Sequence, residues 1–284
     1  RARWALLSLL IFLGASTQYQ SAVYYRDLWN LQKDLWWQLS WRAPGFLPGT
    51  TLVASLPQGY QLPEDYEVWG PANLIYTSGG TLDVGGQIIF DDILAHLMEG
   101  SQVEQVQRGN TVKYDYNKAL ILSIPSTNAC LHVQNGSLPN LGPAEPSDVM
   151  MIAPYSKVEM IDLQAKPKTP PGIIFGPEPP HKWCYYFQKI ELANQAGQWQ
   201  EAASLADEAA RLNLTPLDRT EWLPIMTAYV NSGQENKALQ TAKKIKGDRL
   251  TKIFLCTQFE RVTEWPSGYN QDLLLSILCT TGKE

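Results

Sequence analysis

The stretch GQWQEAASLADEA at residues 197–209 is followed by GQENKALQTAKKI at residues 233–245, and the two align at an offset of 36 residues. Glycine opens both stretches, and alanine recurs at the sixth and tenth positions of each. Small residues at this spacing let paired helices approach closely, and glycine favours the turn that ends a helix. The same offset relates three upstream pairs, which are Tyr186 and Trp222, Ile190 and Met226, and Ala193 and Tyr229.

A period of 36 residues is close to the roughly 34 residues of a tetratricopeptide repeat, in which each unit is a helix–turn–helix. The pattern therefore predicts an all-α, tetratricopeptide-like helical repeat domain over residues 183–284. Apolar patterns at 249–262 and 272–279 predict further helices that cap the array by covering its open apolar face. Such a domain is typical of a scaffold that binds a partner, and it implies no reaction.

Composition is typical of a folded protein with more than one domain. The 284 residues are 44% hydrophobic and 18% charged, which leaves ample material for a core and argues against disorder. The net charge of −5 arises from 23 basic and 28 acidic residues. Because nucleic-acid binding requires a basic surface, we expect no nucleic-acid partner.

The N-terminal residues 1–24 are apolar after a basic start. Arg1 and Arg3 precede a run from Trp4 to Ala15 that only Ser8 interrupts. A signal peptide shows such a basic start, a short apolar core and a small-residue cleavage site. The last transmembrane helix of a longer protein instead shows arginine on the cytoplasmic side and aromatic residues at the outer interface.

We favour the transmembrane helix for residues 1–24, which makes the membrane the first expected partner. About 20 residues are needed to cross a bilayer, so the span extends to about Tyr24. Tyr19, Tyr25 and Trp29 supply an aromatic belt with Tyr24, and the chain starts at arginine rather than methionine, as a piece of a longer protein would. With either alternative, the residues after about 25 lie outside the cytoplasm.

Residues 25–48 continue the helical pattern as a juxtamembrane helix. Tyr25, Leu28, Leu35 and Leu39 recur at steps of three, four and seven residues. The segment from Arg42 to Gly45 contains a proline that predicts the end of this helix.

Residues 49–165 predict a mixed α/β domain, so the whole chain is expected to belong to the α+β class. We expect strands at 51–56, 111–116, 119–124 and 130–133, extended pieces within 66–76, and helices at 88–98 and 155–163. Two glycine pairs, at 79–80 and 85–86, predict a flexible loop between them. The following residues 166–182 contain six prolines, which predict a stiff extended linker.

Motifs that carry chemistry are missing from the sequence. It contains no phosphate-binding GxxxxGK, no HExxH and no GxSxG. The three histidines, His96, His132 and His181, are too scattered to indicate a metal site, and the alternation around His132 predicts an ordinary strand residue. We therefore assign no catalytic, cofactor-binding or metal-binding residue and expect no cofactor.

Two acidic groups have alternative interpretations. Asp91 and Asp92 suit a general acid and base or metal ligands, but acids in this position more often complement a helix N-terminus, and we expect this role. Glu64, Asp65 and Glu67 predict a solvated acidic loop, with cation binding as the less favoured alternative.

The four cysteines, Cys130, Cys184, Cys256 and Cys279, lack the spacing of a metal site. Thiols outside the cytoplasm tend to pair, and four cysteines allow three pairings among which the sequence does not choose. Reduced cysteines buried as small apolar residues are the remaining alternative, and we favour that state over any one specified bridge.

Several segments resemble a known group of proteins. The resemblance includes Ile174–Phe187 with Glu191–Ala193, Trp36–Arg42 with Pro48–Gly49, Tyr114–Leu122, Cys130–Leu131 and Glu221–Pro224. They are similar to the C-terminal part of uncharacterised bacterial polytopic membrane proteins. Those proteins resemble the multi-spanning GT-C-like glycosyltransferases that use lipid-phosphate sugar donors. In these enzymes the catalytic acids lie among early membrane helices that precede the matching region, so no catalytic residue is carried over.

The expected function is a non-catalytic, extracytoplasmic appendage of a polytopic membrane protein, which binds a protein or glycan partner at its helical repeats. The alternative is an acceptor-site region of a membrane glycosyltransferase whose catalytic residues lie upstream of Arg1. A run of further apolar spans before Arg1 would favour the enzyme, whereas a start codon at that point would favour a secreted binding protein.

Overall fold

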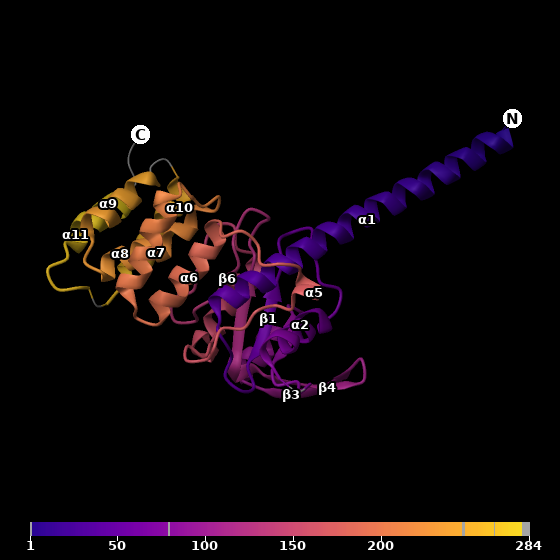
Figure 1. The fold of residues 1–284 in the computed structure, drawn as a ribbon, viewed down its shortest axis with the longest axis horizontal. Helices are drawn as coiled ribbons and strands as arrows, with labels where there is room; N and C mark the ends of the chain where they lie inside the picture. Colours follow the sequence, from indigo (N-terminus) through magenta and orange to yellow (C-terminus); the bar gives the residue numbers. More distant parts are fainter. Residues whose placement is uncertain (1, 79, 246–247, 264, 280–284) are drawn as a thin grey trace.

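A computed structural model describes residues 2–78, 80–245, 248–263 and 265–279 of the chain (Figure 1). A long N-terminal helix projects from a central part that contains the main sheet, and a group of helices lies at the opposite end of the molecule (Figure 1). The fold is therefore mixed, with helices predominating over small sheets.

Helix α1 is one unbroken helix over Ala2–Arg42. Its first half is long and apolar enough to cross a membrane, and the side chains of that apolar segment are exposed. Its second half lies in the core, where Leu35, Trp36 and Leu39 are almost completely buried. The predicted transmembrane and juxtamembrane segments therefore form a single helix, which ends two residues before Pro44 because proline cannot continue it.

The main sheet has four strands in the order β2 (Gly85–Ile88), β1 (Thr51–Ser55), β5 (Ala119–Ser123) and β6 (His132–Val133). Strand β1 pairs in parallel with both β2 and β5, and β6 is antiparallel to β5. The chain thus adds β2 on one side of β1 and β5 on the other side. As a result, the carboxyl ends of three parallel strands meet at one edge of the sheet.

Alternate side chains of the sheet enter two separate apolar clusters, as the period of a strand requires. Leu52 and Leu120 pack with the second half of α1 and with α2 (Tyr66–Tyr76). Val53 and Ile121 pack on the other face, which is covered by the hairpin of β3 (Gln102–Gln107) and β4 (Asn110–Asp115), α3 (Ile93–Glu99) and α4 (Ser147–Ile152). The sheet is therefore buried on both faces.

The extended pieces expected within 66–76 are wrong. These residues form helix α2, because Val68, Ala72 and Ile75 make a helical apolar face that packs against the sheet. Residues 80–84 lie outside helices and strands, as expected for the loop between the glycine pairs, and Gly85 and Gly86 begin strand β2. A Cβ atom on Gly86 would lie 2.5 Å from the Trp69 nitrogen of α2, so glycine here permits close packing rather than flexibility.

The helical part contains α6 (Trp183–Gln195), α7 (Trp199–Arg211), α8 (Leu223–Asn231), α9 (Glu235–Lys244), α10 (Arg249–Glu260) and α11 (Gln271–Cys279). Gly197 and Gly233 follow α6 and α8 with φ values of 68° and 75°. In both turns, the N–H of the residue after glycine donates to a helix carbonyl at 2.8 Å, as in a Schellman motif. The glycines thus end equivalent helices, as the sequence predicts.

The proline-rich segment is not wholly extended. Its residues Gly172–Phe175 form the short helix α5, and Phe175 is buried in the same cluster as α1. The indole nitrogen of Trp37 donates to the Phe175 carbonyl oxygen at 3.2 Å. This part of the predicted linker is therefore attached to the core, because burying Phe175 stabilises the contact.

The cysteines form two disulfides, Cys130–Cys184 and Cys256–Cys279. This corrects the expectation that all four are reduced. The first disulfide joins the segment before β6 to helix α6, and the second joins α10 to α11. The first bridge ties the central part of the molecule to the helical part.

Candidate functional site

A crevice of about 710 Å³ lies at the carboxyl ends of the three parallel strands. It is lined by the ends of β1 and β2, by the loop 56–62, by Pro125 after β5, and by residues 144–148. Ligands of open α/β sheets bind at this edge, at the point where the strand order reverses. Here the reversal occurs at β1, which makes the crevice the first candidate for a binding site.

Glu145 is the buried charged group of the crevice. Its Oε1 atom accepts hydrogen bonds from Ser123 Oγ at 3.2 Å and from Gln134 Nε2 at 3.3 Å, and it lies 2.7 Å from His132 Nδ1. Its Oε2 atom is buried and has no hydrogen-bond partner. A buried carboxylate oxygen without a partner is costly, and the side chain of Glu145 is fully buried.

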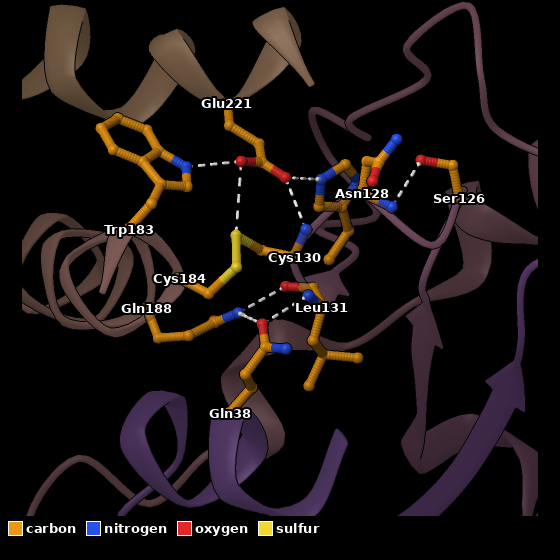
Figure 2. Close-up of a disulfide and its surroundings, with 10 residues drawn as sticks. Gln38, Ser126, Asn128, Cys130, Leu131, Trp183, Cys184, Gln188 and Glu221 are labelled. Atoms are coloured by element: carbon orange, nitrogen blue, oxygen red, sulfur yellow. Dashed lines mark hydrogen bonds and ion pairs between the residues drawn. A yellow bond between two sulfur atoms is a disulfide. The ribbon is translucent and has the colours of Figure 1, made fainter. Parts of the chain in front are cut away.

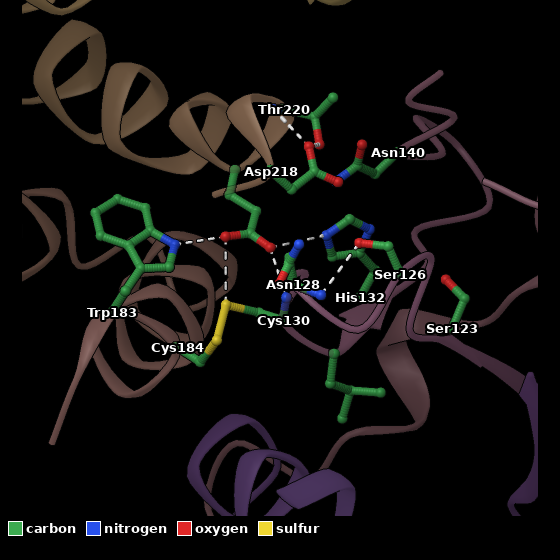
Figure 3. Close-up of polar contacts among 12 residues, drawn as sticks. Ser123, Ser126, Asn128, Cys130, His132, Asn140, Trp183, Cys184, Asp218 and Thr220 are labelled. Carbon is green, nitrogen blue, oxygen red and sulfur yellow. Dashed lines mark hydrogen bonds and ion pairs between the residues drawn. A yellow bond between two sulfur atoms is a disulfide. The ribbon is translucent and has the colours of Figure 1, made fainter. Parts of the chain in front are cut away.

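His132 lies between the carboxylates of Glu145 and Glu221, and Figure 3 shows its ring near Cys130 and Asp218. Its Nδ1 atom contacts Glu145, and its Nε2 atom lies 3.6 Å from Glu221 Oε1. Burial alone would lower the pKa of His132, but its hydrogen bond to Glu145 and the negative charges of Glu145 and Glu221 outweigh burial and raise the pKa to about 10. His132 is therefore protonated at neutral pH and carries a buried positive charge.

Glu221 reaches this histidine from the helical part, where it belongs to a 3₁₀ turn over Arg219–Trp222. Figure 2 shows its carboxylate accepting hydrogen bonds from Cys130 N at 2.6 Å and from Trp183 Nε1 at 2.5 Å. Burial raises the pKa of Glu221, while the nearby charge of His132 opposes this shift. The disulfide of Cys130 and Cys184 lies directly beside the carboxylate (Figure 2).

A second, smaller cavity of about 220 Å³ lies on the other side of His132, between the central and helical parts. Arg42, at the end of α1, and Glu191, in α6, line it. Burial lowers the pKa of Arg42, against the opposing charge of Glu191. His132 also lines this cavity, whereas its partner Glu145 lines the crevice.

The arrangement suits binding better than nucleophilic catalysis. In a serine hydrolase the base lies between the serine and the acid. Here Ser123 donates directly to Glu145, the same carboxylate that His132 contacts. The serine is thus not activated by the histidine, and Glu145 remains as a hydrogen-bond acceptor.

Among the residues that the structure describes, two clusters have ligand atoms close enough to suggest a metal. His132, Asp218 and Glu221 form one, and Cys256, Glu260 and Cys279 form the other. The two cysteines of the second cluster form a disulfide, so they offer no thiolate to a metal.

The structure does not bring the three histidines together. His96 Nδ1 contacts Ser101 Oγ at 2.7 Å, and His181 Nε2 lies 3.0 Å from Glu178. His132 is a strand residue, as predicted, but it differs from an ordinary strand residue because it is buried between two carboxylates.

The acidic residues that the sequence singles out do not line the crevice. Asp91 and Asp92 are exposed, and Asp92 precedes α3 without a side-chain cap hydrogen bond. Glu64 pairs with Arg108 at 2.6 Å, and Asp65 accepts a hydrogen bond from Ile88 N. The predicted acidic loop therefore fastens the hairpin and β2 to α2, which is a structural role.

Sequence reasoning missed Glu145 and Glu221. The sequence offers an indirect clue. It predicts three buried strands, and residues that follow the carboxyl ends of such strands are candidates for a binding site. Nothing in the local pattern around either glutamate indicates a partner, because His132 is remote in sequence from Glu221.

Comparison with protein-family models finds no match for the chain. Comparisons with curated proteins and with solved structures find no match either.

Proposed function

We propose that the chain is the extracytoplasmic, non-catalytic part of a polytopic membrane protein, and that it holds an acceptor or partner beside the membrane. The observation that carries this proposal is helix α1, which exposes an apolar first half and builds its second half into the core. Such a helix would attach the chain to the membrane through its first half and stabilise the folded core through its second half. The two disulfides support an oxidising location.

The helical part is proposed to be a tetratricopeptide-like scaffold. Three observations support this: the equivalent glycine turns, the burial of Ala202 and Ala238, and the burial of Ala206 and Ala242 one helical turn later. Its partner would be a protein or a glycan, as the repeat pattern implies.

The second candidate function is an acceptor-site region of a membrane glycosyltransferase. The crevice at the carboxyl edge of the sheet favours it, because this edge is suited to a bound ligand. The catalytic residues would then lie upstream of this chain, in keeping with the resemblance to GT-C-like enzymes.

Cysteine labelling in intact cells tests the proposed location. All four native cysteines are in disulfides, so a Ser137→Cys variant provides one exposed thiol in the central part. A membrane-impermeant maleimide should label it from outside, and an Ala2→Cys control should react only after lysis. Retention of the labelled chain in carbonate-washed membranes distinguishes an anchor from a cleaved signal peptide. Labelling of Ser137→Cys only after lysis would refute the proposal.

A further inference from the structure

We propose that His132, Asp218 and Glu221 form a binding site for one divalent metal ion, and that zinc is the ion that fits it best. These residues bring a ring nitrogen and two carboxylate oxygens within 4.8 Å of one another (Figure 3). The histidine belongs to β6, whereas both acids belong to the 3₁₀ turn over Arg219–Trp222 and the residue before it. The site therefore forms only where the helical part packs on the sheet, and it does not depend on the proposed membrane anchor.

The Nε2 atom of His132 is the observation that points to a ligand. This atom is buried and has no hydrogen-bond partner, and only 2% of the residue is exposed. The other ring nitrogen, Nδ1, lies 2.7 Å from Glu145 Oε1. Because a carboxylate only accepts, Nδ1 carries the hydrogen of this contact. A metal-binding histidine typically donates its second N–H to a carboxylate in this way, which orients the remaining nitrogen toward the metal.

The distance between His132 Nε2 and Glu221 Oε1 suits two ligands of one ion. The two atoms are 3.6 Å apart, and two ligands of a tetrahedral zinc ion, at bond lengths of about 2.0–2.1 Å, lie about 3.4 Å from each other. An ion bound to both atoms lies between them and needs no cavity of its own. The almost complete burial of both side chains is therefore compatible with binding.

Both carboxylates are held in place by other donors. Cys130 N and Trp183 Nε1 donate to Glu221, and the N–H and hydroxyl of Thr220 donate to Asp218 Oδ1 at 2.9 and 2.7 Å. An ionised carboxylate has about four acceptor positions, so each group keeps positions for a metal. The ligands are thus oriented before an ion binds.

The charges also favour a divalent ion. In the part of the chain that the structure describes, the ion pairs of Glu145 and Glu221 are both with His132, and Asp218 adds a third carboxylate. One proton on the histidine therefore faces three carboxylates, whereas a divalent ion brings twice that charge. The proton and the ion occupy the same place at Nε2, so the protonated His132 described above is the metal-free state.

The donor set selects the kind of metal. Imidazole nitrogen suits zinc and the neighbouring transition metals, whereas magnesium and calcium prefer sites of oxygen ligands. Three protein ligands leave a fourth position, which water takes in zinc sites of this kind. Asp218 lines a pocket of about 360 Å³ together with Ser126 and Asn128, and this pocket gives the ion and its water a route from solvent.

Zinc titration of the full chain in detergent micelles tests the proposal. The protein is first treated with EDTA, with its disulfides intact, and then dialysed. We expect calorimetry to show one zinc ion bound per chain, with release of a proton from His132. Titrations in two buffers of different ionisation enthalpy measure that release. Magnesium and calcium at the same concentration should show no binding.

Variants locate the ion. Asp218→Asn removes a charged ligand, and the turn should stay folded because asparagine also caps helices. We expect zinc affinity to fall by about tenfold or more, since even the loss of a group that only orients a ligand costs that much. His132→Gln should abolish binding in protein with unchanged circular dichroism.

Asp248→Asn is the matched control. Asp248 also precedes a helix, accepts hydrogen bonds from the N–H and hydroxyl of Thr251, and lines the same pocket as Asp218. It does not belong to the cluster around His132, so this variant should bind zinc as the parent does.

Three results would overturn the proposal: the EDTA-treated protein binds no zinc, calcium or magnesium binds as tightly as zinc, or Asp218→Asn binds zinc as tightly as Asp248→Asn. The last result would place the zinc at another position, such as the exposed His181.

Discussion

His132 carries a positive charge, and this histidine and its two carboxylate partners come from three different segments of the chain. The histidine belongs to β6, Glu145 to the turn before α4, and Glu221 to the helical part. A buried charge is tolerated only when it is paired and hydrogen-bonded, so the three residues depend on one another. Removing one partner from such a group typically costs about 3–5 kcal/mol.

This group predicts a pH-dependent stability. The folded-state pKa of His132, about 10, lies above its ordinary value of about 6.5. The stabilisation is therefore fully present below about pH 6.5 and is lost as the pH rises toward 10. We expect His132→Gln to lower the free energy of unfolding by about 3–5 kcal/mol at pH 6, and this deficit should shrink as the pH rises.

Denaturant melts of both proteins from pH 6 to pH 10, with disulfides intact, measure this difference. His181→Gln is the control, because His181 is exposed, and it should differ from the parent by no more than about half a kcal/mol. A deficit of His132→Gln that stays constant with pH would show that the histidine is neutral in the fold.

The sequence predicts His132 as a strand residue but not its partners. Local alternation with Leu131 and Val133 specifies the strand. The pairing with Glu145 and Glu221 arises only when the helical part docks on the sheet, and a single sequence contains no record of that contact.

At the scale of elements, prediction succeeds where periodicity is strong and unambiguous. The apolar run 119–124 forms β5, and the pattern 249–262 forms α10. Strand β3 escapes prediction because its residues are polar and mostly exposed. Helix α2 is mistaken for extended chain because Gly70 and Pro71 disfavour a helix, whereas its packing on the sheet overrides local propensity.

The helix pairs predict which alanines are intolerant. Ala202 and Ala238 are completely buried at equivalent positions of α7 and α9. Ala202→Leu or Ala238→Leu forces extra methylenes into a close contact, and we expect a loss of about 1–3 kcal/mol. Gln198→Leu and Gln200→Leu lie at exposed positions near the same turn and should change stability by about half a kcal/mol or less.

Urea unfolding of the four variants in the full chain compares these values. Equal stability of all four would mean that the alanines do not sit at tight helix contacts, and the repeat interpretation would lose its support.

At the scale of the molecule, the central and helical parts are joined by more than the chain. The disulfide Cys130–Cys184 crosses between them, and Gln188 in α6 donates to the Leu131 carbonyl oxygen at 2.6 Å (Figure 2). The sequence supplies the number of cysteines but not their pairing, since pairing depends on how the two parts dock. The segment 166–182 therefore differs from its neighbours in amino-acid composition, but the two parts that it joins still pack against each other.

Limited proteolysis tests this connection. Lys168 lies in the proline-rich segment, between the two bridged cysteines in sequence. We expect trypsin to cut there while the two products remain one band on a non-reducing gel, and to separate only after reduction. A Cys130→Ala/Cys184→Ala variant, cut in the same way, should give two bands without reduction. Two bands from the parent without reduction would show that this disulfide does not form.

The unbroken helix α1 has a mechanical consequence. Its apolar half and its buried half are joined without a hinge, so in the proposed membrane-anchored arrangement a tilt of the helix would rotate the whole domain. A long span tilts more in a thin membrane. The proposed anchor would therefore let the thickness of the surrounding bilayer set the direction in which the crevice faces.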